Sequence, residues 1–196
     1  EREDLMKQRL QAGLTAMRLT SDNIPSLLQY GELLIETNKV MNLTAITDPD
    51  DIASLHFLDS AALLTLADFP GKTVADVGTG AGFPGLPLRI LEPSIHLTLL
   101  DAQNKRVEFL RKVCQELKLT DVTCVHDRAE VFAAAHREEF DIVTSRAVAN
   151  LQILAELCLP LVRPGGYFLA MKSVDCDQEL SAAHQPIEIL RAHAEE

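Results

Sequence analysis

The sequence predicts an α/β fold with a mostly parallel sheet and helices on both faces. Two observations predict it. The hydrophobic period changes at Thr73 from helical spacing to short apolar strands, and from there strands alternate with helical stretches. The residues before Thr73 show helical patterns. We therefore expect a helical N-terminal extension over residues 1–70, packed on a core domain over residues 71–196.

The N-terminal extension is predicted to contain three helical stretches. Apolar residues at helical spacing predict the first over residues 5–20. The sequence SDNIP at 21–25 is typical of a helix start, and the helix that follows is expected to reach about Lys39. Residues 42–51 (NLTAITDPDD) are expected to form a loop that ends in a cluster of helix-capping residues, after which a helical pattern resumes over 56–66.

The core domain is predicted to contain five short buried strands separated by helices. The strongest helical pattern lies over 104–119, where Val107, Leu110, Val113 and Leu117 share one face. A second covers 150–162. The predicted strands are 73–78, 96–102, 122–127, 141–148 and 166–172.

The net charge of −11 argues against a broadly basic nucleic-acid-binding surface. The excess acid lies in the two ends of the chain, because residues 71–172 hold 12 basic and 12 acidic residues. Contact with nucleic acid would therefore depend on local basic groups. Lys105, Arg106, Arg111 and Lys112 form one such run, either as a solvated helix face or as a contact with RNA backbone.

The cysteines and apolar segments indicate a cytoplasmic protein. The four cysteines are scattered without a CxxC pair, so we expect reduced thiols and no structural zinc. The six histidines show no HxxxH spacing, so no metal site is expected. No apolar run reaches the ~18 residues of a spanning helix, and the charged first residues do not resemble a signal peptide.

A glycine-rich loop follows the first predicted strand, in the sequence DVGTGAGFPG at 76–85. It lacks the GxxxxGK[ST] pattern of a phosphate-binding P-loop. It also departs from the dinucleotide pattern GxGxxG, because Phe83 stands at the third glycine position. The strand before and the helix after it favour a ligand site over a plain turn.

Acidic residues near this loop favour S-adenosylmethionine as its ligand. Asp101 ends the second predicted strand, where a carboxylate can bind both hydroxyls of a ribose. Asp76 lies two residues before the loop and is expected to meet the ammonium group of a methionine moiety, directly or through water. It would repel a pyrophosphate. The sequence HDRAE at 126–130 places Glu130 near the expected adenine position.

Several segments together resemble the family of small-subunit ribosomal RNA guanine-N7 methyltransferase G, also called glucose-inhibited division protein B. The glycine loop alone would indicate only the broad class I methyltransferases. The resemblance runs from about Asn38 to Lys172. It rests on NKVMNLTAI (38–46), HFLDS (56–60), DVGTGAGFPGLPL (76–88), TLLDAQNKRVEFL (98–110), RAE (128–130), SRAVA (145–149) and PGG with MK (164–172).

The resemblance implies a Rossmann-like class I methyltransferase domain that binds S-adenosylmethionine. It also implies a substrate guanine of ribosomal RNA, methylated at N7 in the assembled small subunit. The expected substrate-binding residues are Asn42, His56, Arg128, Arg146 and Lys172. The expected donor-binding residues are Asp76, Gly78, Gly80, Gly82, Phe83, Asp101, Ala102, Ala129, Glu130 and Arg146.

The sequence departs from the family pattern in two places. Leu55 stands before His56 where the family often has a basic residue, which removes one expected phosphate contact. The family usually closes its sheet with a sixth and a seventh strand. Here residues 185–192 (QPIEILRA) could supply one before the sequence ends. Either the closing strands lie outside this sequence or the sheet ends early, and each would leave an open sheet edge.

Methylation at guanine N7 needs no general base, because N7 already carries an exposed lone pair. The enzyme must supply proximity and orientation, and a cation close to the base would oppose its developing positive charge. We expect no catalytic base and assign Arg146 an orienting role, in contact with a phosphate, guanine O6 or the donor carboxylate. The alternative is an ion pair at the strand end.

The other polar residues near the predicted site have open roles. His56 and Asp59 lie three residues apart on one helix face, for substrate contact or for packing. Asn42 either lines the pocket or closes its loop, and His126 is interpreted as a strand-end residue. Three alternative functions remain at this point: a small-molecule methyltransferase, a non-catalytic assembly module and an NAD-dependent oxidoreductase.

Overall fold

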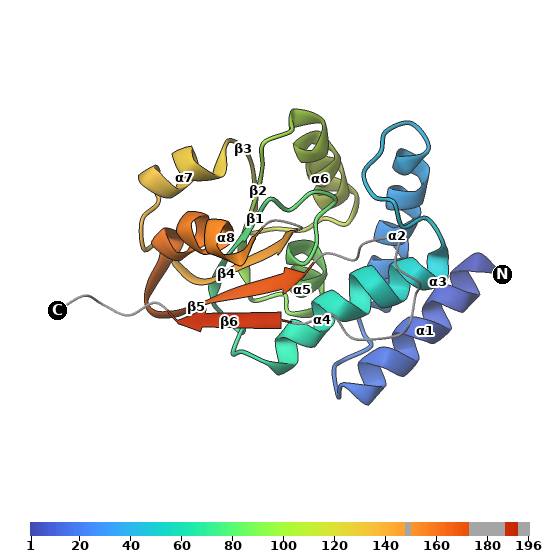
Figure 1. Ribbon diagram of the computed structural model, residues 1–196. Helices are drawn as coiled ribbons and strands as arrows, with labels where there is room; N and C mark the ends of the chain where they lie inside the picture. The colour runs from blue at the N-terminus through green and yellow to red at the C-terminus, as the bar shows by residue number, and fades with distance from the viewer. Residues whose placement is uncertain (148–149, 173–186, 192–196) are drawn as a thin grey trace.

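The computed structural model describes residues 1–147, 150–172 and 187–191, and within these it contains a six-stranded sheet (Figure 1). The strands are β1 (Thr73–Val77), β2 (His96–Asp101), β3 (Val122–His126), β4 (Phe140–Ala147), β5 (Val162–Lys172) and β6 (Ile187–Arg191). The α-helices are α1 (Arg2–Ala16), α2 (Ile24–Asn38), α3 (Pro49–Asp51), α4 (Asp59–Ala62), α5 (Gly85–Leu91), α6 (Asn104–Glu116), α7 (Ala129–Ala135) and α8 (Leu151–Cys158).

The strand order β3-β2-β1-β4-β5-β6 confirms the predicted α/β fold. The first five strands are parallel, and β6 pairs antiparallel with β5 at the sheet edge. The chain leaves β1 toward β2 on one side and returns to β4 on the other. The carboxyl ends of β1 and β4 therefore lie at the topological switch point, where open α/β sheets bind their ligands.

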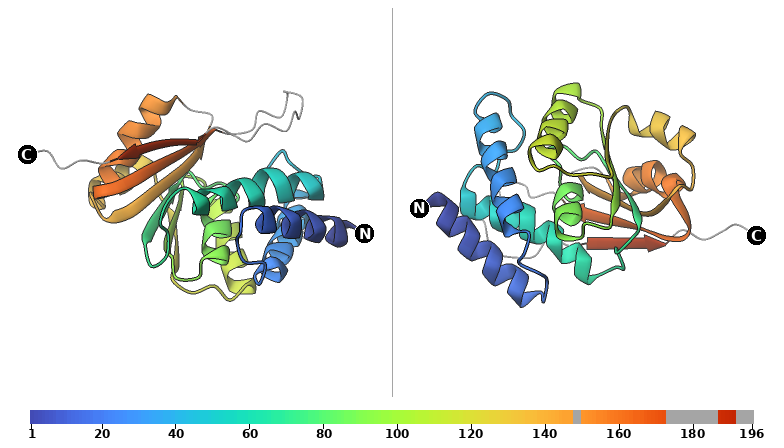
Figure 2. Two further views of the ribbon diagram at one scale, coloured as in Figure 1. Left: turned by 90° about the horizontal axis from the view of Figure 1, so that it is seen from below. Right: turned by 180° about the vertical axis from the view of Figure 1, so that it is seen from behind.

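Helices cover both faces of the sheet, as Figures 1 and 2 show. Because side chains alternate along a strand, neighbouring residues of β1 enter different cores: Val74 joins the core beneath α5 and α6, and Ala75 the core beneath α7 and α8. A strand buried on both faces reads as a nearly continuous apolar run. This is why the strands were recognisable in the sequence.

The N-terminal helices share the core of the α5 and α6 face. Leu10 of α1 and Leu27 of α2 are fully buried in the same hydrophobic cluster as Phe83 and Leu86 beside the glycine loop. The chain then forms one helical run from Pro49 to Thr65, in which the π-helix η1 (Ile52–Leu58) joins α3 to α4 and the 3₁₀ turn η2 (Leu63–Thr65) follows.

The structure differs from the prediction where this helical run begins. Residues 42–51 were expected to be a loop, but α3 starts at Pro49. The Asp48 side chain accepts hydrogen bonds from the backbone N–H groups of Asp50 and Asp51 and so caps the helix. The acidic cluster therefore starts the helix seven residues before the predicted position.

The last predicted strand is confirmed by β6, whose Ile187–Arg191 lie within the expected range 185–192. Among the parts of the chain that the structure describes, no helix is long and apolar enough to cross a membrane. Cys114, Cys124 and Cys158 are free thiols, whereas Cys176 lies outside the described residues.

Candidate functional site

A cavity of about 260 Å³ opens at the switch point. Its walls come from the glycine loop after β1, the start of α6 after β2, the end of β4, and the segment between α2 and α3. That volume is below the ~300–1,000 Å³ of sites that enclose a drug-sized ligand. The cavity therefore fits one end of such a ligand. It is lined by Leu43, Thr44, Ala45, Ile46, His56, Gly78, Thr79, Gly80, Ala81, Phe83, Arg106 and Arg146.

The glycine loop leaves room for a ligand at two of its glycines. Gly78 and Gly80 adopt φ values of +66° and +59°, which favour glycine. A Cβ atom at either position would meet nothing within 4 Å, so both face open space along the cavity. Gly82 differs, because its Cβ would lie against the Tyr30 hydroxyl and the Leu86 side chain. It allows close packing behind the loop.

Asp76 is fully buried behind the loop and holds it from the sheet side. Its Oδ2 accepts hydrogen bonds from the Thr79 hydroxyl at 2.7 Å and from the Gly85 N–H at 2.9 Å, and its Oδ1 accepts one from the Thr144 hydroxyl. Burial raises the pKa of this carboxyl to about 6, although these bonds lower it in part. Asp76 does not line the cavity.

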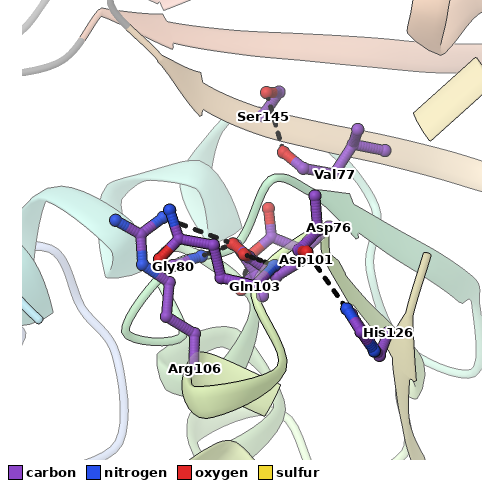
Figure 3. Close-up of polar contacts among 10 residues, drawn as sticks. Asp76, Val77, Gly80, Asp101, Gln103, Arg106, His126 and Ser145 are labelled. Atoms are coloured by element: carbon purple, nitrogen blue, oxygen red, sulfur yellow. Dashed lines mark hydrogen bonds and ion pairs between the residues drawn. The ribbon is translucent and has the colours of Figure 1, made fainter. Parts of the chain in front are cut away.

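Asp101 connects the end of β2 to the glycine loop (Figure 3). Its Oδ2 accepts a hydrogen bond from the Gly80 N–H at 2.9 Å, and its Oδ1 accepts one from the Gln103 N–H at 2.9 Å. The Arg106 guanidinium lies 3.7 Å from Oδ2 and lines the cavity. The side chain is 4% exposed, so the carboxylate is fixed in place beside the loop.

Arg146 lies in β4, at the end of the strand that faces the cavity. Its guanidinium donates hydrogen bonds to the Leu55 carbonyl oxygen at 3.2 Å and to His56 Nδ1 at 2.8 Å. Burial lowers the pKa of Arg146 from its usual value. Burial, followed by the Arg146 charge, holds the pKa of His56 well below 6.5. His56 is therefore neutral at physiological pH.

Aromatic rings form the rear wall of the cavity around Phe83. The His56 ring stacks on the Phe83 ring with centroids 4.2 Å apart and planes 4° apart, and Tyr30 stacks at 5.3 Å. The Arg146 guanidinium lies 5.1 Å from the Phe83 ring centroid, within the range of a cation–π contact. Phe83 thus links η1, α2 and β4 behind the glycine loop.

The structure brings five predicted site residues together at the cavity: Gly78, Gly80, Phe83, Arg146 and His56. Asp101 reaches it through Gly80 and Arg106. A second group of predicted residues follows the ends of β2 and β3. The Ala102 carbonyl oxygen accepts a hydrogen bond from His126 Nε2. Arg128 is exposed directly before α7, and Ala129 and Glu130 begin that helix.

Two predicted substrate-binding residues lie apart from the cavity lining. Asn42 is exposed in the segment before α3 and does not line the cavity. Lys172 ends β5, and its side chain lies outside the described part of the structure. Within the described residues no group of three His, Cys, Asp or Glu side chains is placed to hold a metal ion.

Sequence reasoning missed Thr44, Asn38 and Tyr30. Asn38 Oδ1 accepts hydrogen bonds from the N–H groups of Leu43 and Thr44, and its Nδ2 donates to the Thr44 carbonyl oxygen. This amide fixes the segment that carries Thr44 into the cavity wall. Asparagine bonding to nearby backbone is a recognisable local signal, and Asn38 opens a segment already noted for its resemblance.

Comparison with known proteins identifies the family. The family model described as rRNA small subunit methyltransferase G matches residues 23–196. The Ribosomal RNA small subunit methyltransferase G of Desulforamulus reducens is 47% identical over 88% of this chain and 73% of its own length. That of Staphylococcus epidermidis is 49% identical over 86% and 71%, and that of Desulfitobacterium hafniense 47% identical over 96% and 77%.

Solved structures support the fold. A SAM-dependent methyltransferase from Aquifex aeolicus matches with a TM-score of 0.51 and 19% identity, over 65% of this chain and 71% of that one. The YcgJ protein of Bacillus subtilis matches with a TM-score of 0.53 and 22% identity, over 60% and 51%. With the family model covering most of the chain, we conclude that it belongs to the rRNA small subunit methyltransferase G family.

Proposed function

We propose that this protein uses S-adenosylmethionine to methylate N7 of a guanine in small-subunit ribosomal RNA, acting on the assembled subunit in the cytoplasm. The cavity at the switch point carries the proposal. It combines open space at Gly78 and Gly80 with a fixed carboxylate at Asp101 and a partly buried cation at Arg146. Family membership supports the same reaction.

The residues present fit this methyl donor. The two open glycine positions let a ligand chain approach the loop backbone, and Asp101 stands where a carboxylate binds ribose hydroxyls. Ala102, Ala129 and Glu130 lie beside it on the side proposed for the adenine. Asp76 is buried and has three hydrogen-bond partners, so we assign it to holding the loop.

When bound, S-adenosylmethionine supplies a methyl group on a positively charged sulfur, which a nitrogen lone pair can attack. The chain's own residues then orient the two partners and exclude water. Hydrogen bonds to the Leu55 carbonyl and His56 Nδ1 hold the Arg146 guanidinium in one position in the cavity wall, so its charge does not move toward the methylated, cationic guanine. His56 is neutral and adds no opposing charge.

The test combines donor binding with mapping of the product. Calorimetric titration of the protein with S-adenosylhomocysteine should give saturable binding, whereas NAD should give none. Incubation with labelled donor and small subunits from cells lacking the enzyme should label one guanine, and cleavage chemistry selective for 7-methylguanine should locate the methyl group. Label on another base atom, or donor binding without transfer to any ribosomal RNA, would contradict the proposal.

A further inference from the structure

A directional chain of hydrogen bonds runs along the cavity wall from Arg146 to Thr44. The arginine guanidinium has only donors, so in its 2.8 Å contact with His56 the Nδ1 atom must be the acceptor. A neutral imidazole that accepts at Nδ1 carries its proton on Nε2. That Nε2–H group therefore donates to the Thr44 hydroxyl oxygen, 2.9 Å away.

The Thr44 hydroxyl oxygen has a second donor. The backbone N–H of Ile46 points at it from 3.1 Å, so both of its lone pairs are occupied. The hydroxyl hydrogen remains, and among the described residues none accepts it. Thr44 lines the cavity together with His56 and Arg146. This series of hydrogen bonds thus presents one hydrogen-bond donor, with no acceptor capacity left, in the wall of the cavity that the glycine loop also lines.

We propose that Thr44 binds the carboxylate of the methyl donor through this hydroxyl group. The inference rests on the proposed function, which places the methionine end of the donor along Gly78 and Gly80. The donor's ammonium group would need an acceptor, which Thr44 cannot offer. The carboxylate is an acceptor. Among the described residues no acidic side chain lines the cavity, whereas Arg106 and Arg146 do.

In this arrangement Arg146 is a positioning residue as well as a source of charge. Its bond to Nδ1 fixes the His56 tautomer, and that tautomer fixes the direction in which Thr44 donates. Asn38 holds the backbone of Leu43 and Thr44 in place through three hydrogen bonds. The carboxylate of the methyl donor would therefore be bound by the loop between α2 and α3, which precedes the α/β domain in the sequence.

The test compares two ligands that differ only in the carboxylate. Affinities for S-adenosylmethionine and for decarboxylated S-adenosylmethionine are measured by calorimetry on the wild type, Thr44→Val and Thr44→Ser. We expect Thr44→Val to weaken binding of the intact donor about ten-fold, as for a lost hydrogen bond to a charged group. It should change binding of the decarboxylated compound less than two-fold, and Thr44→Ser should bind both as the wild type does.

The second ligand separates recognition from structural damage. Thr44→Val also removes the acceptor of Ile46 N–H and His56 Nε2–H, and a disturbed loop would weaken both ligands equally. Equal loss would overturn the proposal. So would unchanged donor affinity with a raised KM for small subunits, which would place the hydroxyl toward the RNA. Thr65→Val is the matched control. The hydroxyl removed there donates to the Ala62 carbonyl oxygen, away from the cavity.

A spectroscopic measurement tests the hydrogen bonds from Arg146 through His56 to Thr44 without any ligand. Long-range ¹⁵N–¹H correlation spectra of the histidine rings should show His56 as the Nε2–H tautomer, neutral at physiological pH because its pKa is lowered by burial and by the Arg146 charge. The Nδ1–H tautomer would leave the Arg146 guanidinium without its acceptor and would make Nε2 the acceptor of the Thr44 hydroxyl, which would overturn the inference. Failure of the proposed function is distinguishable, because the wild type would then bind neither S-adenosylmethionine nor S-adenosylhomocysteine.

Discussion

The hydroxyl of Tyr30 donates a hydrogen bond to the carbonyl oxygen of Ala81, and this bond ties helix α2 to the glycine loop. Both residues are buried. The two positions are 51 residues apart, so the bond forms only when the N-terminal helices pack on the α/β domain. The conformation of the loop therefore depends on residues that precede the first strand.

Replacing Tyr30 with Phe tests this coupling. The ring keeps its stacking on Phe83, but the buried Ala81 carbonyl loses its donor. We expect the free energy of unfolding to fall by about 1–3 kcal/mol, measured by urea denaturation. S-adenosylhomocysteine should bind several-fold more weakly. Unchanged stability together with unchanged affinity would show that the bond does not support the loop.

Asp101→Asn tests the proposed ribose contact. The amide can still accept one bond, but the negative charge that serves Gly80, Gln103 and the proposed hydroxyls is lost. We expect S-adenosylhomocysteine to bind about ten-fold more weakly. The wild type should also prefer this ligand over its 2′-deoxy analogue, and the variant should lose that preference. A preserved preference would exclude the ribose contact. Asp121→Asn, on an exposed aspartate before β3, is the control.

Arg146→Lys separates charge from geometry. Lysine keeps a positive charge but cannot reproduce the paired contacts with the Leu55 carbonyl and His56 Nδ1. We expect about ten-fold weaker donor binding in this variant. In Arg146→Ala the charge is lost as well, and the pKa of His56 should rise from its wild-type value, as followed by NMR titration. Near-native methylation of small subunits by a folded Arg146→Ala protein would refute the orienting role.

The stability of the protein should carry a pH signature of Asp76. Its pKa is about 6 in the folded state, above the usual 3.8, so between these values the folded state holds a proton that the unfolded state has released. The contribution of Asp76 to stability is therefore largest below about pH 4 and is lost as the pH rises through 6.

Comparison with Asp76→Asn isolates this effect. The difference in unfolding free energy, wild type minus variant, should fall by about 2–3 kcal/mol between pH 4 and pH 7. Urea denaturation at several pH values measures it. A difference that stays constant, or that grows with pH, would contradict the assignment. His56 cancels in the subtraction because both proteins contain it.

The sequence predicted the α/β domain well because central strands such as β1 are buried on both faces and the helices on one, although the edge strand β3 is only partly buried. Val74 and Ala75 lie in the cores on opposite faces of the sheet, so both are apolar. Such a continuous apolar run can be recognised in the sequence without knowing which elements pack against the strand. The capping residues at the end of 42–51 are visible in the sequence, but the predicted helical pattern begins at His56, whereas the helical run begins at Pro49, directly after the Asp48 cap. The π-helical stretch over Ile52–Leu58 carries no comparable sequence signal, because its backbone pattern departs from helical spacing.

The candidate site was predicted in part for a related reason. Gly78, Gly80 and Asp101 follow strands, so chain order places them at one edge of the sheet. Bonds to Asn38 and His56 fix Thr44 in the cavity wall, and His56 in turn is bonded to Arg146, 90 positions away. The sequence around a threonine in a loop does not show which distant residues its hydroxyl will contact. Its role becomes visible once the three segments are placed together.

The shared core of the N-terminal helices and the glycine loop has a consequence for engineering. A shortened protein that began at Thr73 would retain every strand, yet it would expose Phe83 and Leu86, which the first helices now cover. It would also lose the segment that carries Thr44 and His56. In chimaeras of related proteins, residues 1–70 should therefore be exchanged together with the glycine loop that they support. Neither the N-terminal helices nor the α/β domain forms the complete binding surface by itself.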